Sequence, residues 1–136
     1  MKGNIIKLHE FSTNNTLLIN ADIVMACDIT INNGQKKTRI IFNEKFDTRM
    51  YMYINETPEK VYSYICKTNK DNRYMILHEV DGNSPLLINF SNVAMIGTSN
   101  KGTMVYMRKN LYIRDNTAMT PACVHESVSE IEKKFL

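Results

Sequence analysis

Apolar and polar residues alternate over most of the chain, a period-two pattern that is typical of half-buried strands. Turn residues interrupt the pattern at Asn32-Asn33-Gly34 and at Ser99-Asn100-Lys101-Gly102, where Asn and Gly tolerate the positive φ of hairpin turns. We expect strands over 4–10, 17–30 with a break near 20–22, 37–43, 49–55, 74–80, 86–98 with a break near 89, 103–108 and 122–125.

Two segments instead carry the start signals of helices. Thr57 is followed by Pro58, and proline suits the first helical position because the N–H that it lacks would have no partner there. The second segment opens on Ser127-Val128-Ser129-Glu130, the pattern of a capping box. The sequence therefore predicts short helices over about 57–67 and 127–135, each packed across its own sheet.

Three short motifs occur twice along the chain, in the same order and at nearly the same spacing. The first two pairs are separated by 69 residues and the third by 70. The pairs are Leu8-His9-Glu10 with Leu77-His78-Glu79, Leu17-Leu18-Ile19-Asn20 with Leu86-Leu87-Ile88-Asn89, and Ile54-Asn55-Glu56-Thr57 with Val124-His125-Glu126-Ser127. Such recurrence indicates an internal repeat.

The predicted fold class is therefore α+β, with two similar β-rich repeats over 1–69 and 70–136. Each repeat is expected to form an antiparallel sheet followed by one short C-terminal helix. A unit of this size buries only enough surface to be marginally stable on its own. We expect the two repeats to pack as one compact unit.

Composition is that of an ordinary globular domain, with 43% hydrophobic and 23% charged residues among 136. The 17 basic and 14 acidic residues give a net charge of +3, which permits an anionic partner. Short, scattered basic pairs do not form the stripe that nucleic acid binding needs. Nucleic acid is therefore not the expected partner.

The cellular setting is predicted from what the sequence lacks. No apolar run approaches the ~20 residues of a membrane helix, and the first residues lack the apolar stretch of a signal peptide. Cys27, Cys66 and Cys123 are widely spaced and include no CxxC, so we expect free, mostly buried thiols rather than disulfides or a zinc site. We predict a cytoplasmic protein with no membrane partner.

Motifs that would indicate catalysis are missing from the sequence. It contains no phosphate-binding glycine loop, no GxSxG and no cluster with metal-ligand spacing. His9-Glu10 and His78-Glu79 could suggest acid–base pairs, but adjacent residues on a strand point to opposite faces and cannot cooperate directly. We expect no catalytic residue, no metal site, no cofactor and no enzymatic activity.

Strand alternation places tyrosine and arginine on one sheet face in each half, opposite the face that packs on the helix. These residues form interface hot spots, and they also stack on bases and bind phosphates. Three interpretations stay open: a plain solvated face, a homo-oligomer or partner interface, and a pocket for a small anionic, nucleotide-like ligand. The candidate ligand-binding or interface residues are Arg39, Arg49, Tyr51, Tyr53, Tyr106, Arg108, Tyr112 and Arg114.

The second half also carries a turn glycine, an apolar pair before Asn, an apolar strand, a Gly-Thr strand and Val-x-Glu-Ser before a short helix. These positions are Gly82, Leu87-Ile88-Asn89, Val93, Ile96, Gly102-Thr103 and Val124-His125-Glu126-Ser127. On these residues it resembles the FlbD family of small flagellar and swarming-motility proteins, and the first half does so more weakly. The resemblance implies a small non-enzymatic accessory protein. The chain differs from that pattern by its tandem pair and by the insertion Lys109–Ala122.

The favoured function is a non-catalytic binding protein that acts as a homo-oligomer. It is either an accessory assembly protein or one that sequesters a small anionic ligand. A phage-encoded sponge that holds a nucleotide-derived signalling molecule without cleaving it is one form of the second version. The alternatives are a phosphoester-processing enzyme that uses His78 or His125 with Arg108, and a phage structural component.

Overall fold

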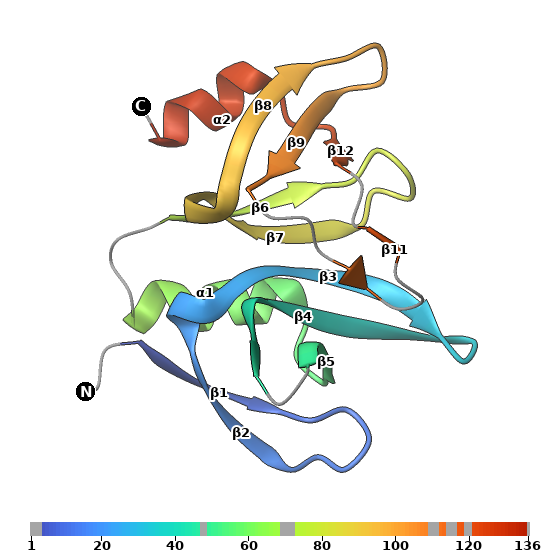
Figure 1. Cartoon of the computed structure of the whole chain (residues 1–136), viewed down its shortest axis with the longest axis vertical. Coiled ribbons are helices and arrows are strands. Elements are labelled where there is room, and N and C mark those ends of the chain that lie inside the picture. Colours follow the sequence, from blue (N-terminus) through green and yellow to red (C-terminus); the bar gives the residue numbers. More distant parts are fainter. Residues whose placement is uncertain are drawn as a thin grey trace.

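The chain folds as a mixed α+β structure of mostly antiparallel sheets with two short helices (Figure 1). It is a computed structural model, and it describes residues 4–46, 49–68, 73–108, 112–113, 117–118 and 121–135. At 45–46, 49, 112–113 and 117–118 only the backbone is described.

The first half contains a hairpin, three further strands and a helix. Its elements are β1 (Ile5–His9), β2 (Thr16–Asn20), the 3₁₀ helix η1 (Ala21–Ile23), β3 (Val24–Asn32), β4 (Gln35–Phe46), β5 (Arg49–Ile54) and α1 (Pro58–Thr68). Asn33 and Gly34 have φ of 51° and 76°, the left-handed backbone that the predicted hairpin turn requires. Lys60 N donates to Thr57 Oγ1 at 3.2 Å, so the predicted cap begins α1.

The second half contains the same elements in the same order, with two additional short strands. Its elements are β6 (Tyr74–His78), β7 (Pro85–Asn89), the 3₁₀ helix η2 (Phe90–Asn92), β8 (Val93–Thr98), β9 (Thr103–Met107), β10 (Tyr112–Ile113), β11 (Thr117–Ala118), β12 (Ala122–Val124) and α2 (Val128–Phe135). Glu130 N donates to Ser127 Oγ at 3.1 Å and Ser127 N donates to Glu130 Oε1 at 3.2 Å. This confirms the predicted capping box.

Apart from β10 and β11, which pair with each other, the described strands of the two halves are linked in one series. The central sheet has the order β5-β4-β3-β7-β6, so it combines strands from both halves. An isolated bridge links the end of β1 to β5, and another links the end of β6 to β12. The sequence predicts one sheet in each half, whereas this sheet crosses the boundary, because β3 and β7 pair with each other there.

Two hydrophobic cores lie on either side of this junction. One is built mainly from the first half and the other mainly from the second. Tyr74 and Leu87 of the second half enter the first core, and Met25, Ala26 and Ile41 of the first half enter the second. All five are at most 3% exposed. Separating the halves would therefore expose core residues of both.

The helices cover different parts of this arrangement. α1 contacts β1 and β3 of its own half and also β6 and β7 of the second half, with Val61 and Ile65 buried in the first core. α2 packs against β8 and buries Ile131, and Phe135 stacks on Phe90 with ring centroids 4.4 Å apart. The expectation that each helix lies across its own sheet is therefore incomplete for α1, which spans the junction.

Candidate functional site

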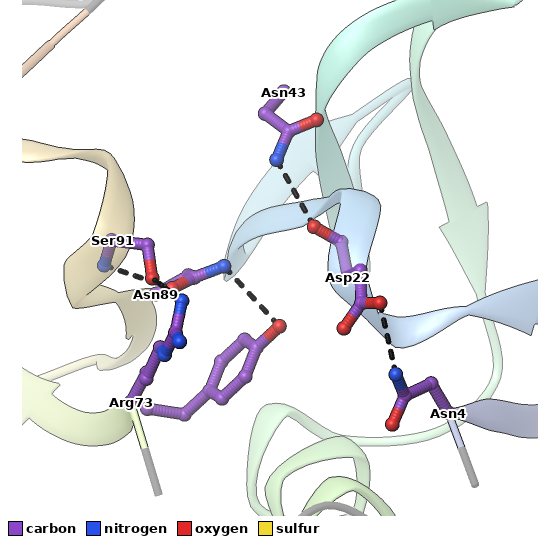
Figure 2. A pocket seen from close by; sticks show the side chains of 7 residues that line it. Asn4, Asp22, Asn43, Arg73, Asn89 and Ser91 are labelled. Atoms are coloured by element: carbon purple, nitrogen blue, oxygen red, sulfur yellow. Dashed lines mark hydrogen bonds between the residues drawn. The ribbon is translucent and has the colours of Figure 1, made fainter. Parts of the chain in front are cut away.

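A polar pocket lies where the two halves meet (Figure 2). Its volume is about 340 Å³, which lies in the range of small-molecule sites. Three of its lining residues come from the first half and four from the second. They are Asn4, Asp22 and Asn43, and Arg73, Tyr74, Asn89 and Ser91.

Two residues of the second half fix its wall to the first half. Asn89 Nδ2 donates to Val24 O at 3.0 Å and to Tyr74 Oη at 3.2 Å. Tyr74 Oη in turn donates to Ala21 O at 2.6 Å. Burial, with a smaller contribution from the Asp22 charge, raises the pKa of Tyr74 to about 12. The hydroxyl therefore stays protonated and keeps its role as a donor at neutral pH.

The two 3₁₀ turns beside the pocket are stabilised in the same way. Asn20 Oδ1 accepts from Asp22 N, and Asn89 Oδ1 accepts from Ser91 N, both at 2.9 Å. Asparagine side chains commonly stabilise a turn by bonding to the backbone two residues on. These turns hold Asp22 and Ser91 at the pocket wall.

The pocket carries a carboxylate and a guanidinium on opposite sides (Figure 2). Asp22 Oδ2 accepts from Asn4 Nδ2 at 2.9 Å, and Arg73 Nη1 donates to Ser91 Oγ at 3.2 Å. A second guanidinium lies beside it, since Arg108 Nη1 donates to Ser91 O at 3.2 Å. Both arginines are exposed. Two accessible positive charges therefore converge on one residue of the pocket.

This set of groups suits a small molecule with several polar functions. A guanidinium donates paired hydrogen bonds to a phosphate or a carboxylate. A carboxylate accepts from amino groups, and asparagine amides both donate and accept. The pocket can therefore bind an anionic group at one side and a hydrogen-bond donor at the other.

Arg39 is buried and does not lie on an open sheet face. It is 8% exposed, and it donates to Asp28 from Nε to Oδ1 at 3.0 Å and from Nη2 to Oδ2 at 2.6 Å. Burial by itself would lower the pKa of Arg39, but the hydrogen bond and charge of Asp28 raise it above its ordinary value. The prediction of an outward-facing residue is wrong here, because the second core covers this face through Ile41 and Tyr51.

The tyrosines next to this pair are half-buried. The Tyr51 and Tyr53 rings meet edge to face with centroids 5.6 Å apart, and Lys37 Nζ lies 5.1 Å from the Tyr53 ring centroid. Glu79 of the second half lies nearby, where burial and then the charge of Asp28 raise its pKa. In the first half, the predicted Tyr/Arg surface is therefore largely an interior polar cluster.

Of the other predicted residues, the structure describes the side chains of Tyr106 and Arg108. Tyr106 is half-buried and Arg108 is exposed, and Arg108 reaches the pocket through its bond to Ser91. The side chains of Arg49 and Tyr112 and the whole of Arg114 lie outside the described residues. Among the predicted residues whose side chains the structure describes, Arg108 bonds to a residue that lines the pocket, Ser91.

Each half contains a histidine bound by a glutamate from the segment before its helix. Glu56 accepts from His9 N at 3.0 Å and lies 2.7 Å from His9 Nδ1. Glu126 does the same with His78, at 2.9 and 2.7 Å. Sequence reasoning considered only the adjacent glutamates. Because each carboxylate holds both the backbone and the ring of one residue, the pair fixes a strand end to a helix start.

Sequence reasoning missed most of the pocket. Asn4, Asp22, Asn43 and Arg73 lie far apart along the chain and belong to no repeated motif. The pairing of the two halves brings them together. The available signal was Asn89, which ends the repeated Leu-Ile-Asn motif and would have pointed to the turn at the pocket wall.

Within the described part of the chain, metal ligands and thiols give no further candidate site. Among the residues that the structure describes, no group of three or more His, Cys, Asp or Glu side chains could hold a metal ion. Neither described helix has the length and apolar character of a membrane-spanning segment. The cysteines are free thiols, as predicted, but only Cys27 is buried; Cys66 is exposed and Cys123 is half-buried. Burial, with smaller effects of nearby carboxylates, raises the pKa of the Cys27 thiol.

Known proteins do not guide the assignment of function. A scan against protein-family models matches none, and a search of curated proteins finds no similar sequence. The resemblance to the FlbD family stays a prediction, and the function has to be inferred from the geometry of the site.

Proposed function

We propose that the chain is a tandem duplication of one unit, over 1–69 and 70–136, and that it acts as a non-catalytic binding protein for a small anionic ligand. Hydrogen bonds that recur at the repeat offset support the tandem duplication. The polar pocket between the halves supports the binding of a small anionic ligand.

The register of the strands supports the duplication. The pairing of β3 with β4 shifts between Val24 and Ala26, and the pairing of β8 with β9 shifts between Val93 and Met95, 69 residues later. Such bulges are specific local features rather than a general property of sheets. The His–Glu pairs and the asparagine caps recur in the same way. A FlbD-like origin of the unit is consistent with this.

One observation supports a ligand: the exposed guanidinium of Arg73 and the carboxylate of Asp22 line a pocket whose other lining groups are amides and hydroxyls, and Arg108 lies beside it through its bond to Ser91 O. A nucleotide-like molecule has matching chemistry. Its phosphate would bind Arg73 and Arg108, and a base amino group would donate to Asp22. The ligand class is therefore a small anion that also has hydrogen-bond donors.

The contacts of the pocket residues support holding rather than reaction. The Tyr74 hydroxyl and the Asn89 amide already bond to main-chain carbonyls across the junction. His78 and His125, which a phosphoester-processing enzyme would use, are not among the described residues that line the pocket. We therefore favour a ligand-sequestering protein over the enzyme alternative.

Calorimetry with a panel of nucleotides tests the proposal. We expect one or more nucleotides to bind, and we expect Arg108→Ala to weaken binding about tenfold or more, because a charge-assisted hydrogen bond is lost. Lys101→Ala is the matched control: Lys101 is an exposed cation on the β8–β9 turn, whereas Arg108 bonds to Ser91, which lines the pocket. Chromatography of the released ligand should show it intact.

Three results would count against the proposal. The absence of heat with every nucleotide would remove the ligand. An equal loss of affinity in the Arg108→Ala and Lys101→Ala variants would place the binding site elsewhere. Recovery of a cleaved ligand would support the enzyme instead.

A further inference from the structure

The strand series has an open backbone edge at each end. Among the described residues, β2 pairs only with β1, and β8 pairs only with β9. The β1–β2 hairpin lies at the bottom of Figure 1 and β8 lies at the top, so the two edges are at opposite ends of the molecule. Each edge carries an exposed apolar side chain, Leu18 at 70% and Met95 at 58%. Such edges readily pair with strands of another chain.

The junction inside the chain pairs two strands that correspond to the open edges. β3 pairs with β7 through Ala26 opposite Ile88 and Cys27 opposite Leu87. At the repeat offset, β3 corresponds to β8 and β7 corresponds to β2. The pairing of β3 with β7 is therefore a pairing of the same two kinds of strand that are left open at the ends.

We propose that β8 of one copy pairs with β2 of a second copy of this chain, in the register of β3 with β7. At the repeat offset, this places Met95 opposite Ile19 and Ile96 opposite Leu18. The exposed side chains of both edges would be buried at the new junction. The inference rests on the proposed duplication and not on the proposed ligand.

The charges beside the two edges are complementary. Asn43 and Ser91 line the pocket at the internal junction, one from each half. Arg108 occupies the place of Asn43 in the second half: Asn43 Nδ2 donates to Asp22 O at 3.1 Å, and Arg108 Nη1 donates to Ser91 O at 3.2 Å. Asp22 likewise occupies the place of Ser91 in the first half. The proposed junction would therefore bring Arg108 of one copy close to Asp22 of the next.

This association is head-to-tail. Each copy has one edge of each kind, so a contact uses β8 of one chain and β2 of the other. Such heterologous contacts close into a ring or continue as a filament. Either product is larger than one chain of 15.7 kDa.

Sedimentation velocity on the full chain tests the proposal. We expect an oligomer for the natural sequence and monomers for Leu18→Lys and Met95→Lys, because a buried lysine opposes strand pairing. Ile31→Lys is the matched control: Ile31 is an apolar residue 63% exposed on β3, away from the paired residues of β3 and β7. It should leave the oligomer intact. Circular dichroism checks that all three variants are folded.

Mixing the two disrupted variants identifies the partner strand. Leu18→Lys keeps an intact β8 and Met95→Lys keeps an intact β2, so an equimolar mixture should form a dimer with one copy of each. A monomeric natural sequence, or an oligomer that survives both lysine substitutions, would overturn the proposal. Self-association of each variant without the other would overturn it as well. Nucleotide binding by a monomer would leave the proposed function standing while this inference fails.

Discussion

The internal junction and the two open edges of the molecule present matched strands in opposite surroundings. Ala26 on β3 is fully buried, whereas Met95, at the matched position on β8, is 58% exposed. Leu87 on β7 is fully buried, whereas Leu18 on β2 is 70% exposed. Strands at matched positions in the two halves are thus buried where another strand pairs with them and exposed where none does. Burial here is a property of the pairing and not of the strand alone.

The two regions also differ in their polar groups. On β3 and β4, Asp28 lies opposite Arg39 and the pair is buried. On β8 and β9, Gly97 lies opposite Met104 in the corresponding pair. A buried ion pair constrains the partners that can cover it. The internal junction is therefore specialised for the second half, while the β8 edge has no such constraint from this position.

The largest effect is expected from a substitution that breaks the ion pair between Asp28 and Arg39 at the internal junction. Arg39→Met introduces the residue type found at the matched position 104, and it leaves the Asp28 carboxylate buried without its partner. We expect the free energy of unfolding to fall by about 3–5 kcal/mol, measured by urea denaturation. The double variant with Asp28→Ala should recover part of this loss. A cost typical of a surface substitution would show that the pair is not buried in solution.

The second prediction compares matched leucines directly. Leu87→Ala removes a fully buried side chain from the first core, and we expect it to lower the free energy of unfolding by about 2–5 kcal/mol. Leu18→Ala, measured on a sample dilute enough to be monomeric, should change it by no more than about 0.5 kcal/mol. Equal costs in the monomer would mean that the two strands have similar surroundings, which would remove the contrast.

Local features of the fold could be predicted from the sequence. The Asn33-Gly34 turn, the Thr57 cap and the Ser127–Glu130 capping box depend on residues that are close in the chain, and each is present as expected. The period-two pattern also identified the strands on either side of each break. These features follow from backbone geometry and short-range hydrogen bonds, which the sequence expresses directly.

The candidate site depended on long-range pairing and could not be predicted in this way. Alternation correctly placed Arg39 on the face opposite Ile40, but it could not show that the second core would cover that face. Asp22 and Arg73 line the same pocket because β3 pairs with β7, and the sequence of neither strand identifies its partner. Matched edges become recognisable only after the register is known.

The third prediction concerns the hydrogen bonds that join the halves at the pocket. Tyr74→Phe removes the donor to Ala21 O and the acceptor for Asn89 Nδ2. We expect a loss of about 1–2 kcal/mol in the free energy of unfolding, because buried polar groups lose their partners. Ile5→Ala, at the matched and partly exposed position, is the comparison. Ultraviolet titration of the natural sequence should include an ionisation near pH 12 from Tyr74, and this ionisation should be missing from the variant.

The smallest predicted effect uses a feature that both halves share. Each His–Glu pair lies within one half, so Glu56→Gln and Glu126→Gln should have similar costs of about 1 kcal/mol each. Similar costs at the two glutamates would contrast with the costs at Leu87 and Leu18, whose matched positions differ in burial. Strongly unequal costs would mean that the surroundings of the two pairs differ as much as those of the strand edges.

The pKa of Glu126 predicts how the stability of the natural sequence changes with pH relative to Glu126→Gln. Burial by itself would raise the pKa of Glu126, but hydrogen bonds from the ring and backbone of His78 outweigh it and lower the pKa below its ordinary value of 4.5. As the pH falls, the unfolded chain therefore takes up the proton before the folded chain does. The stability that the ionised Glu126 gains from His78 is complete above the ordinary carboxyl pKa and is lost as the pH falls below it. Between about pH 6 and pH 4 the natural sequence should lose more stability than Glu126→Gln. Parallel urea curves at the two pH values measure the difference, and equal losses in both proteins would show that the Glu126 carboxylate gains nothing from His78.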